Sequence, residues 1–142
     1  MRKILMLLFI LSVLLCSSFA GAQDIIHKPA SRVVAYYFYG NFRCSTCYKL
    51  EQYSKEAIET NFKDAISSGK LEFKVVNVED KGNEHYAKDY QLYTKSLVLS
   101  LAKDGKEVKW KNLDKIWEYV GNKQRFLDYV KAGVADFLKE AE

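Results

Sequence analysis

Residues 32–47 read Arg-Val-Val-Ala-Tyr-Tyr-Phe-Tyr-Gly-Asn-Phe-Arg-Cys-Ser-Thr-Cys. The run from Val33 to Tyr39 contains only apolar, β-branched and aromatic residues, and Gly40 then favours a turn. A run without polar alternation is typical of a strand that is buried on both faces in the middle of a sheet. The stretch therefore predicts a central strand that leads directly into two cysteines, Cys44 and Cys47.

The residues around and after the cysteines predict further elements. Apolar or small residues recur at helical spacing, which predicts a helix from about Ser45 to Ser67 that stops near Gly69. Six further segments are expected in the order strand, short helix, strand, strand, helix and helix: 71–78, 84–92, 96–102, 107–110, 113–120 and 126–138.

This order predicts an α/β fold with a central mixed β-sheet of about four strands flanked by helices. The first strand, helix and strand should form a parallel unit, because such crossovers join parallel strands. Asp104-Gly105 is a hairpin signal and should add an antiparallel edge. The last two helices should cover one face of the sheet, because their apolar stripes need burial.

The N-terminus has the three parts of a secretory signal peptide. Met1-Arg2-Lys3 is basic, an apolar run covers 4–15, and Ala20-Gly21-Ala22 resembles a cleavage site. The apolar run is shorter than the roughly 20 residues that span a bilayer. We therefore expect a signal peptide at 1–22 and one domain at 23–142, located in the periplasm or secreted. An uncleaved membrane anchor is the alternative.

The charge pattern does not favour nucleic acid as a partner. The chain has 22 basic and 18 acidic residues, and removal of Arg2 and Lys3 leaves 20 against 18. The two signs are interspersed, as on an ordinary solvated surface. We expect a monomer whose partner in the cell envelope is a protein thiol or disulfide.

The cysteine pair is the best candidate for chemistry. Cys16 lies inside the predicted signal, so the mature chain keeps only Cys44 and Cys47. A bond between them would close a very small loop and add little stability, which argues against a purely structural role. A redox-active Cys44–Cys47 disulfide is the only cofactor-like group that we expect.

The predicted helix start gives the two cysteines different roles. Unpaired backbone N–H groups at a helix N-terminus lower the pKa of a cysteine there, and Arg43 is expected to add positive charge beside Cys44. Cys47 follows one turn later and can attack a mixed disulfide on Cys44. Ser45 and Thr46 can offer hydroxyls to the Cys44 sulfur or to the helix start.

The predicted order and the cysteine motif resemble the thioredoxin-like superfamily from Val33 onward, with Cys44-Ser45-Thr46-Cys47 in place of Cys-Gly-Pro-Cys. Residues 37–47 and the Lys-Ser-Leu-Val-Leu strand are similar to small exported thioredoxin-like proteins named as a nitrophenyl-compound nitroreductase subunit, encoded near arsenical-resistance genes. The resemblance implies a thiol-disulfide oxidoreductase. It does not extend to direct nitroreduction, since the sequence has no flavin or nicotinamide motif such as G-x-G-x-x-G.

The resemblance also shows two departures. Thioredoxins carry a cis-proline that shapes the substrate groove and keeps metals off the cysteines, and Lys95-Ser96 stands there in this chain. We expect a trans bond at Lys95-Ser96, because a cis bond without proline is costly. The buried acid of thioredoxins matches a position near Phe38, where this chain has no carboxylate. Proton transfer to Cys47 would then need a tyrosine hydroxyl, water or Glu51.

Three alternatives stay open at this point. Cys44 and Cys47 could hold a soft ion such as Cu(I) or arsenite. They could form an inert local disulfide, or the chain could be a subunit of a redox complex that keeps the fold as a scaffold. Phe42 and Arg43, in an exposed loop, are expected to dock a partner, and Trp110 and Trp117 to pack the hairpin against the helix at 113–120.

Overall fold

The computed structural model describes residues 30–142. The predicted signal peptide at 1–22 lies outside these residues. The described chain forms nine elements: β1 Ser31–Tyr39, α2 Ser45–Asn61, α3 Lys63–Ser67, β2 Leu71–Asn77, α4 His85–Asp89, β3 Ser96–Lys103, β4 Lys106–Asn112, α5 Ile116–Tyr119 and α6 Lys123–Glu140. Within this range no helix is both long enough and apolar enough to cross a membrane.

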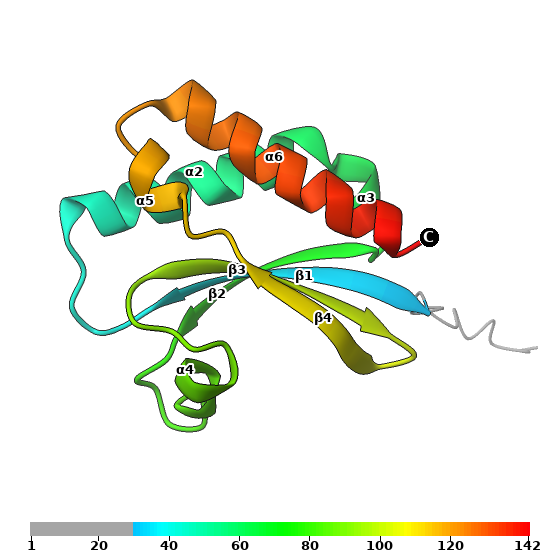
Figure 1. Ribbon diagram of the computed structural model, residues 1–142, viewed down its shortest axis with the longest axis horizontal. Coiled ribbons are helices and arrows are strands. Elements are labelled where there is room, and N and C mark those ends of the chain that lie inside the picture. The colour runs from blue at the N-terminus through cyan, green and yellow to red at the C-terminus, as the bar shows by residue number, and fades with distance from the viewer. Residues whose placement is uncertain (1–29) are drawn as a thin grey trace, which may run out of the picture.

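The four strands form one mixed sheet in the order β2-β1-β3-β4 (Figure 1). β1 pairs with β2 in parallel and with β3 antiparallel, and β3 pairs antiparallel with β4. This arrangement confirms the predicted α/β class and the four-stranded mixed sheet flanked by helices. A βαβ unit followed by a hairpin and a helix, in this strand order, is a thioredoxin-like fold.

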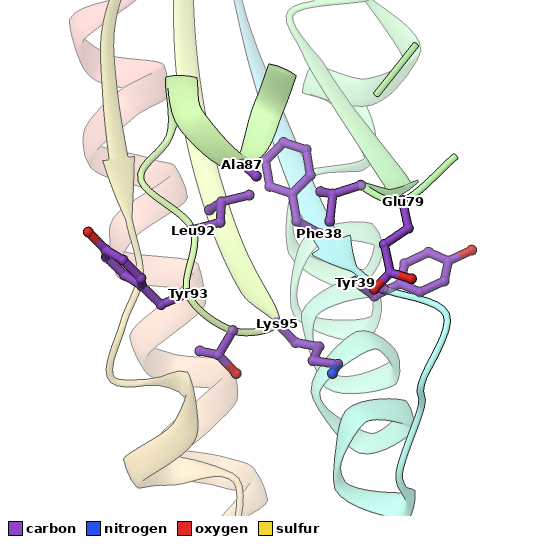
Figure 2. A pocket seen from close by; sticks show the side chains of 10 residues that line it. Phe38, Tyr39, Glu79, Ala87, Leu92, Tyr93 and Lys95 are labelled. Carbon is purple, nitrogen blue, oxygen red and sulfur yellow. The ribbon is translucent and has the colours of Figure 1, made fainter. Parts of the chain in front are cut away.

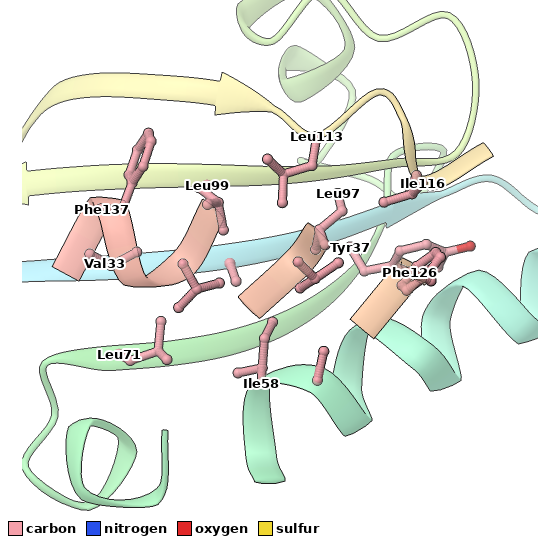
Figure 3. Packing of buried hydrophobic residues seen from close by; sticks show 14 of the residues in the cluster. Val33, Tyr37, Ile58, Leu71, Leu97, Leu99, Leu113, Ile116, Phe126 and Phe137 are labelled. Carbon is pink, nitrogen blue, oxygen red and sulfur yellow. The ribbon is translucent and has the colours of Figure 1, made fainter. Parts of the chain in front are cut away.

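β1 is buried on both faces, as its sequence predicts. Val33, Ala35 and Tyr37 face the main core, where α2 and α6 pack on the sheet (Figure 3). Phe38 lies in a second core together with Tyr90 and other aromatic side chains. This core is on the opposite face of the sheet, which α4 covers (Figure 1). The two cores explain why this strand shows no polar alternation.

The β3–β4 hairpin forms at the predicted turn. Asp104 and Gly105 have φ angles of 49° and 80°, and two positive φ values at the central residues are those of the tight turn that Asp-Gly favours. β4 extends to Asn112, two residues beyond the predicted end. The strand continues into Leu113, whose backbone N–H donates to the Leu97 carbonyl at 2.8 Å.

The single helix predicted over 45–67 is interrupted. α2 ends at Asn61 and α3 begins at Lys63, with Phe62 between them in a non-helical conformation. The Asn61 side-chain amide donates to the Ala57 carbonyl at 2.8 Å. This side chain competes with the backbone for an acceptor in the last turn, which weakens continuation of the helix.

The prediction for 113–120 was also too long, since only Ile116–Tyr119 is helical. Ile116 and Tyr119 are buried, whereas Trp117 is 37% exposed. Trp110 packs on the opposite face of the sheet, with its ring 5.4 Å from that of Tyr90. The expectation that Trp110 and Trp117 together join the hairpin to this helix was therefore wrong.

Candidate active site

The two cysteines form the start of α2. Cys44 is the N-cap residue, and its Sγ accepts a hydrogen bond from the Cys47 backbone N–H at 3.3 Å. In return, the Cys44 backbone N–H donates to the Cys47 Sγ at 3.2 Å. This reciprocal pattern is a capping box in which two thiols take the places of the usual hydroxyl and carboxylate. It holds both sulfur atoms at the same end of the helix.

The two thiols differ in access to solvent. Cys47 is 1% exposed, whereas Cys44 is partly exposed, and both are free thiols in the structure. A bulky disulfide substrate can therefore reach Cys44 but not Cys47. This asymmetry agrees with the order of attack that the spacing predicts.

Hydrogen bonds at the helix start lower the pKa of Cys44 below its ordinary value. The largest cause is the hydrogen bond from the Cys47 side chain, and the backbone N–H groups of Cys47 and Thr46 add to it. These donors stabilise the thiolate, which is the reactive form of a cysteine. Within the described residues neither the Ser45 nor the Thr46 hydroxyl makes a hydrogen bond, so the contribution expected from those hydroxyls is absent.

The contacts of Arg43 are with groups other than Cys44. Its guanidinium lies 4.3 Å from the ring centre of Tyr39 and 4.3 Å from that of Tyr48. It also forms an ion pair with Glu51, one turn beyond Cys47. The positive charge of Arg43 therefore lies between two rings and a carboxylate. These contacts hold the loop before Cys44 in position. Glu51 is correspondingly half-buried and paired, rather than a free proton carrier.

Tyr37 is the tyrosine that contacts Cys47, whereas the sequence left a tyrosine hydroxyl open there without indicating which one. Its side chain is fully buried on the α2 face of β1, and its hydroxyl donates to the Cys47 carbonyl at 2.7 Å. Burial, followed by the nearby Cys47, raises the pKa of Tyr37. Phe38, the position matched to the buried acid of thioredoxins, faces α4 instead. Strand alternation shows that Tyr37 and Phe38 face opposite sides, but not which side carries the cysteines.

Lys95 and Ser96 lie where β3 begins, and only Lys95 reaches the loop before Cys44. The Lys95 Nζ is 5.7 Å from the Phe42 ring centre, and its carbonyl accepts from the Trp117 Nε1 at 2.8 Å. Ser96 shares the sheet face of Val98, opposite α2, and its Oγ donates to the Thr94 carbonyl at 2.9 Å. The described chain contains no cis peptide bond, as expected for Lys95-Ser96.

Exposed aromatic side chains flank the accessible thiol along the chain. Phe42 is 77% exposed in the loop before Cys44, and Tyr48 is 56% exposed on the first turns of α2. Large exposed rings next to a reactive group are typical of protein-binding surfaces. The exposure predicted for Phe42 is confirmed, whereas Arg43 is largely covered by its ring partners.

In the part of the chain that the structure describes, no three His, Cys, Asp or Glu side chains lie together as metal ligands. The Nδ1 atom of His85 lies 2.7 Å from the carboxylate of Asp89, one turn further along α4. A soft ion at this site would therefore have the two cysteine sulfurs as its protein ligands within residues 30–142.

No family model and no curated protein matches this chain. Solved structures similar to it include a thioredoxin from Fasciola hepatica, at 24% identity and a TM-score of 0.37, over 65% of this chain and 81% of that chain. They also include Trxlp from Edwardsiella tarda EIB202, at 15% identity and a TM-score of 0.42, over 72% and 85% of the two chains. Thioredoxin O2 from Arabidopsis thaliana, in its oxidized state, gives 12% identity and a TM-score of 0.42, over 72% and 83%. The assignment of a thioredoxin-like fold to this chain rests on the strand order and connectivity described above.

Proposed function

We propose that this chain is an exported thiol-disulfide oxidoreductase that works through Cys44-Ser45-Thr46-Cys47. The observation that carries the proposal is the pairing of an accessible Cys44, whose pKa is lowered, with a buried Cys47 that contacts it through a reciprocal capping box. This arrangement supplies one attacking thiolate and one resolving thiol.

The reaction proceeds in two exchanges. The Cys44 thiolate attacks one sulfur of a substrate disulfide, so that a mixed disulfide forms and the other substrate sulfur leaves as a thiolate. Cys47 then attacks the Cys44 sulfur, releases the second substrate thiolate and closes the Cys44–Cys47 disulfide. The substrate gains two electrons and the protein loses two, and a partner dithiol must reduce the protein again. The same steps in reverse oxidise a substrate dithiol.

The cell envelope is the compartment that we propose for this chemistry. A signal peptide at 1–22 would be cleaved after Ala22, and the mature protein would begin at Gln23 in the periplasm or outside the cell. Mass spectrometry of the native protein tests this, since it should find an N-terminus at Gln23. Full-length chain in the cytosol would contradict export.

A redox titration tests the proposed activity. The purified protein is equilibrated with buffers of defined ratio of reduced to oxidised dithiothreitol or glutathione, and the Cys44–Cys47 disulfide is quantified by alkylation. We expect a single reversible two-electron transition, together with catalysis of insulin reduction by dithiothreitol that is lost in Cys44→Ser. A pair that stays reduced, or a disulfide that never exchanges, would contradict the proposal.

The same preparation separates the alternatives. Cu(I) or arsenite that stays bound after purification under reducing conditions, without insulin reduction, would favour a metal or metalloid carrier. Neither activity, together with co-purification in a larger redox complex, would favour a scaffold subunit. Reduction of nitrophenyl compounds is not part of this proposal, because the two thiols supply disulfide exchange.

A further inference from the structure

A small pocket lies on the α4 side of the sheet, next to the loop that leads to Cys44. Its volume is about 180 Å³, below the range of about 300–1,000 Å³ that holds drug-sized ligands. Residues from four segments line it: the end of β1, the chain after β2, α4, and the chain between α4 and β3 (Figure 2). The pocket is therefore suited to a small molecule.

One end of the pocket is apolar. Phe38, Ala87 and Leu92 gather there (Figure 2). The end of α4 fixes Leu92, because its backbone N–H donates to the Ala87 carbonyl at 2.8 Å while Gln91 adopts a φ of 51°. These features form a Schellman motif, which commonly turns the residue after the left-handed position towards apolar neighbours. The apolar end is thus built by the backbone and is preformed.

The other end carries one positive and one negative side chain. The Glu79 carboxylate and the Lys95 ammonium both lie there (Figure 2). Within residues 30–142 neither forms an ion pair with another side chain, although Lys95 also lies near the Phe42 ring. Glu79 is exposed and Lys95 is partly exposed, so both charges are accessible to a ligand that enters the pocket.

Hydrogen bonds hold the acidic wall in place. The Asn77 side chain accepts from the Glu79 backbone N–H at 3.1 Å and donates to the side chains of Asn41 and Asp80 at 2.8 and 2.9 Å. Asn77 is buried, with 8% of its surface exposed. At Gly40, a Cβ would collide with the Glu79 carboxylate, so the missing side chain leaves room for that group against the main chain.

From these features we propose that the pocket binds a free α-amino acid with an apolar side chain. The ammonium group of such a ligand would pair with Glu79 and its carboxylate with Lys95, while its side chain would fill the apolar end against Phe38 and Leu92. A zwitterion satisfies both charges at once, whereas a simple acid or amine leaves one of them unpaired. The proposal does not depend on the redox function, since none of these groups is a thiol.

Binding of L-leucine to the purified protein, measured by isothermal titration calorimetry, tests the proposal. The comparison ligands are 4-methylpentanoate, which lacks the ammonium group, and 3-methylbutylamine, which lacks the carboxylate. We expect leucine to bind at least about fivefold more tightly than either, which corresponds to about 1 kcal/mol for one partly exposed ion pair. No leucine binding, or equal binding of all three ligands, would overturn the proposal without any variant.

Two variants then locate the site. Glu79→Gln should weaken leucine binding at least about fivefold and leave the binding of 4-methylpentanoate unaffected. Lys95→Gln should also weaken leucine binding at least about fivefold, but it should leave the binding of 3-methylbutylamine unaffected. Glu59→Gln and Lys63→Gln, exposed positions in α2 and α3, are the matched controls and should change nothing. Leucine affinity that is the same in all four variants would overturn the assignment of the site. Cys44→Ser should still bind leucine, because no thiol lines the pocket. A lack of leucine binding would therefore contradict the pocket proposal and leave the redox proposal unaffected.

Discussion

Cys44 and Cys47 are three residues apart and yet have different environments. The sequence predicted this difference, because a helix start fixes which thiol meets the free backbone N–H groups. It could not predict the surroundings of Arg43 and Tyr37. Arg43 pairs with Glu51 eight residues further on, and Tyr37 meets Cys47 from another element. Such partners depend on how β1 packs under α2, which local spacing does not determine.

The hydrogen bond from the Cys47 thiol should set much of the reactivity of Cys44. In Cys47→Ala this donor is lost, so the pKa of Cys44 should rise and alkylation by iodoacetamide should need a higher pH. In Cys47→Ser a hydroxyl can still donate, and the pKa should stay closer to that of the wild type. The measurement is the alkylation rate of each variant between pH 5 and pH 10.

The lowered pKa of Cys44 fixes the direction in which its reactivity depends on pH. A lowered pKa keeps Cys44 as thiolate at pH values where an ordinary cysteine, with a pKa near 8.5, is mostly protonated. The wild type should therefore react faster than a free thiol of the same intrinsic reactivity at neutral pH. Identical pH profiles in Cys47→Ala and Cys47→Ser would show that the side-chain donor has no effect.

Arg43 should act on stability more than on reactivity. Arg43→Ala removes two ring contacts and leaves Glu51 half-buried without its partner, which should lower the free energy of unfolding by about 1–2 kcal/mol. Lys123→Ala is the control, because Lys123 also contacts a ring, Tyr53, and an acid, Glu56, but in an exposed setting. Lys123→Ala should lower the free energy of unfolding by less than about 1 kcal/mol. Urea unfolding measures both.

Arg43→Ala also tests whether the charge of Arg43 acts on Cys44. Since Arg43 is not among the largest causes of the lowered pKa of Cys44, Arg43→Ala should shift the pH profile of alkylation little. A clear shift of that profile to higher pH would restore the direct role that its position in the sequence suggested.

At the scale of the elements, the sequence predicted the turns and strands well but misplaced the ends of the helices. Asp104-Gly105 placed the hairpin correctly because few residue pairs adopt two positive φ angles. The end of α4 gave no such signal, since the left-handed position that usually holds glycine is occupied by Gln91. The length of α5 was overestimated, because the apolar spacing in this segment reflects the burial of Ile116 and Tyr119 more than a regular helix.

The left-handed conformation of Gln91 should cost stability that glycine would recover. Gln91→Gly should raise the free energy of unfolding by about 0.5–1 kcal/mol, because the penalty for a side chain in this conformation exceeds the extra freedom of glycine in the unfolded chain. Gln52→Gly is the matched control in the interior of α2 and should lower it by about 1 kcal/mol. Thermal and urea unfolding both report the change, and destabilisation by Gln91→Gly would contradict this reading of α4.

At the scale of the whole molecule, the two faces of the sheet carry different features. The α2 face carries the main core and the cysteines, and the α4 face carries the aromatic core and the small pocket. The parallel first unit and the antiparallel hairpin edge followed from the sequence because crossovers and hairpins allow few arrangements. The pocket did not, since its walls come from segments that are distant in sequence and meet only in the folded chain.

The most direct measurement of the redox account is intact-mass analysis after reaction with oxidised glutathione. The reduced wild type should pass to an internal Cys44–Cys47 disulfide, whereas Cys47→Ser should keep one glutathione on Cys44 because no thiol is left to resolve it. Cys44→Ser should stay unmodified, since Cys47 is 1% exposed. A stable glutathione adduct on Cys47 in Cys44→Ser, or a wild type that accumulates the adduct without closing its own disulfide, would contradict the account.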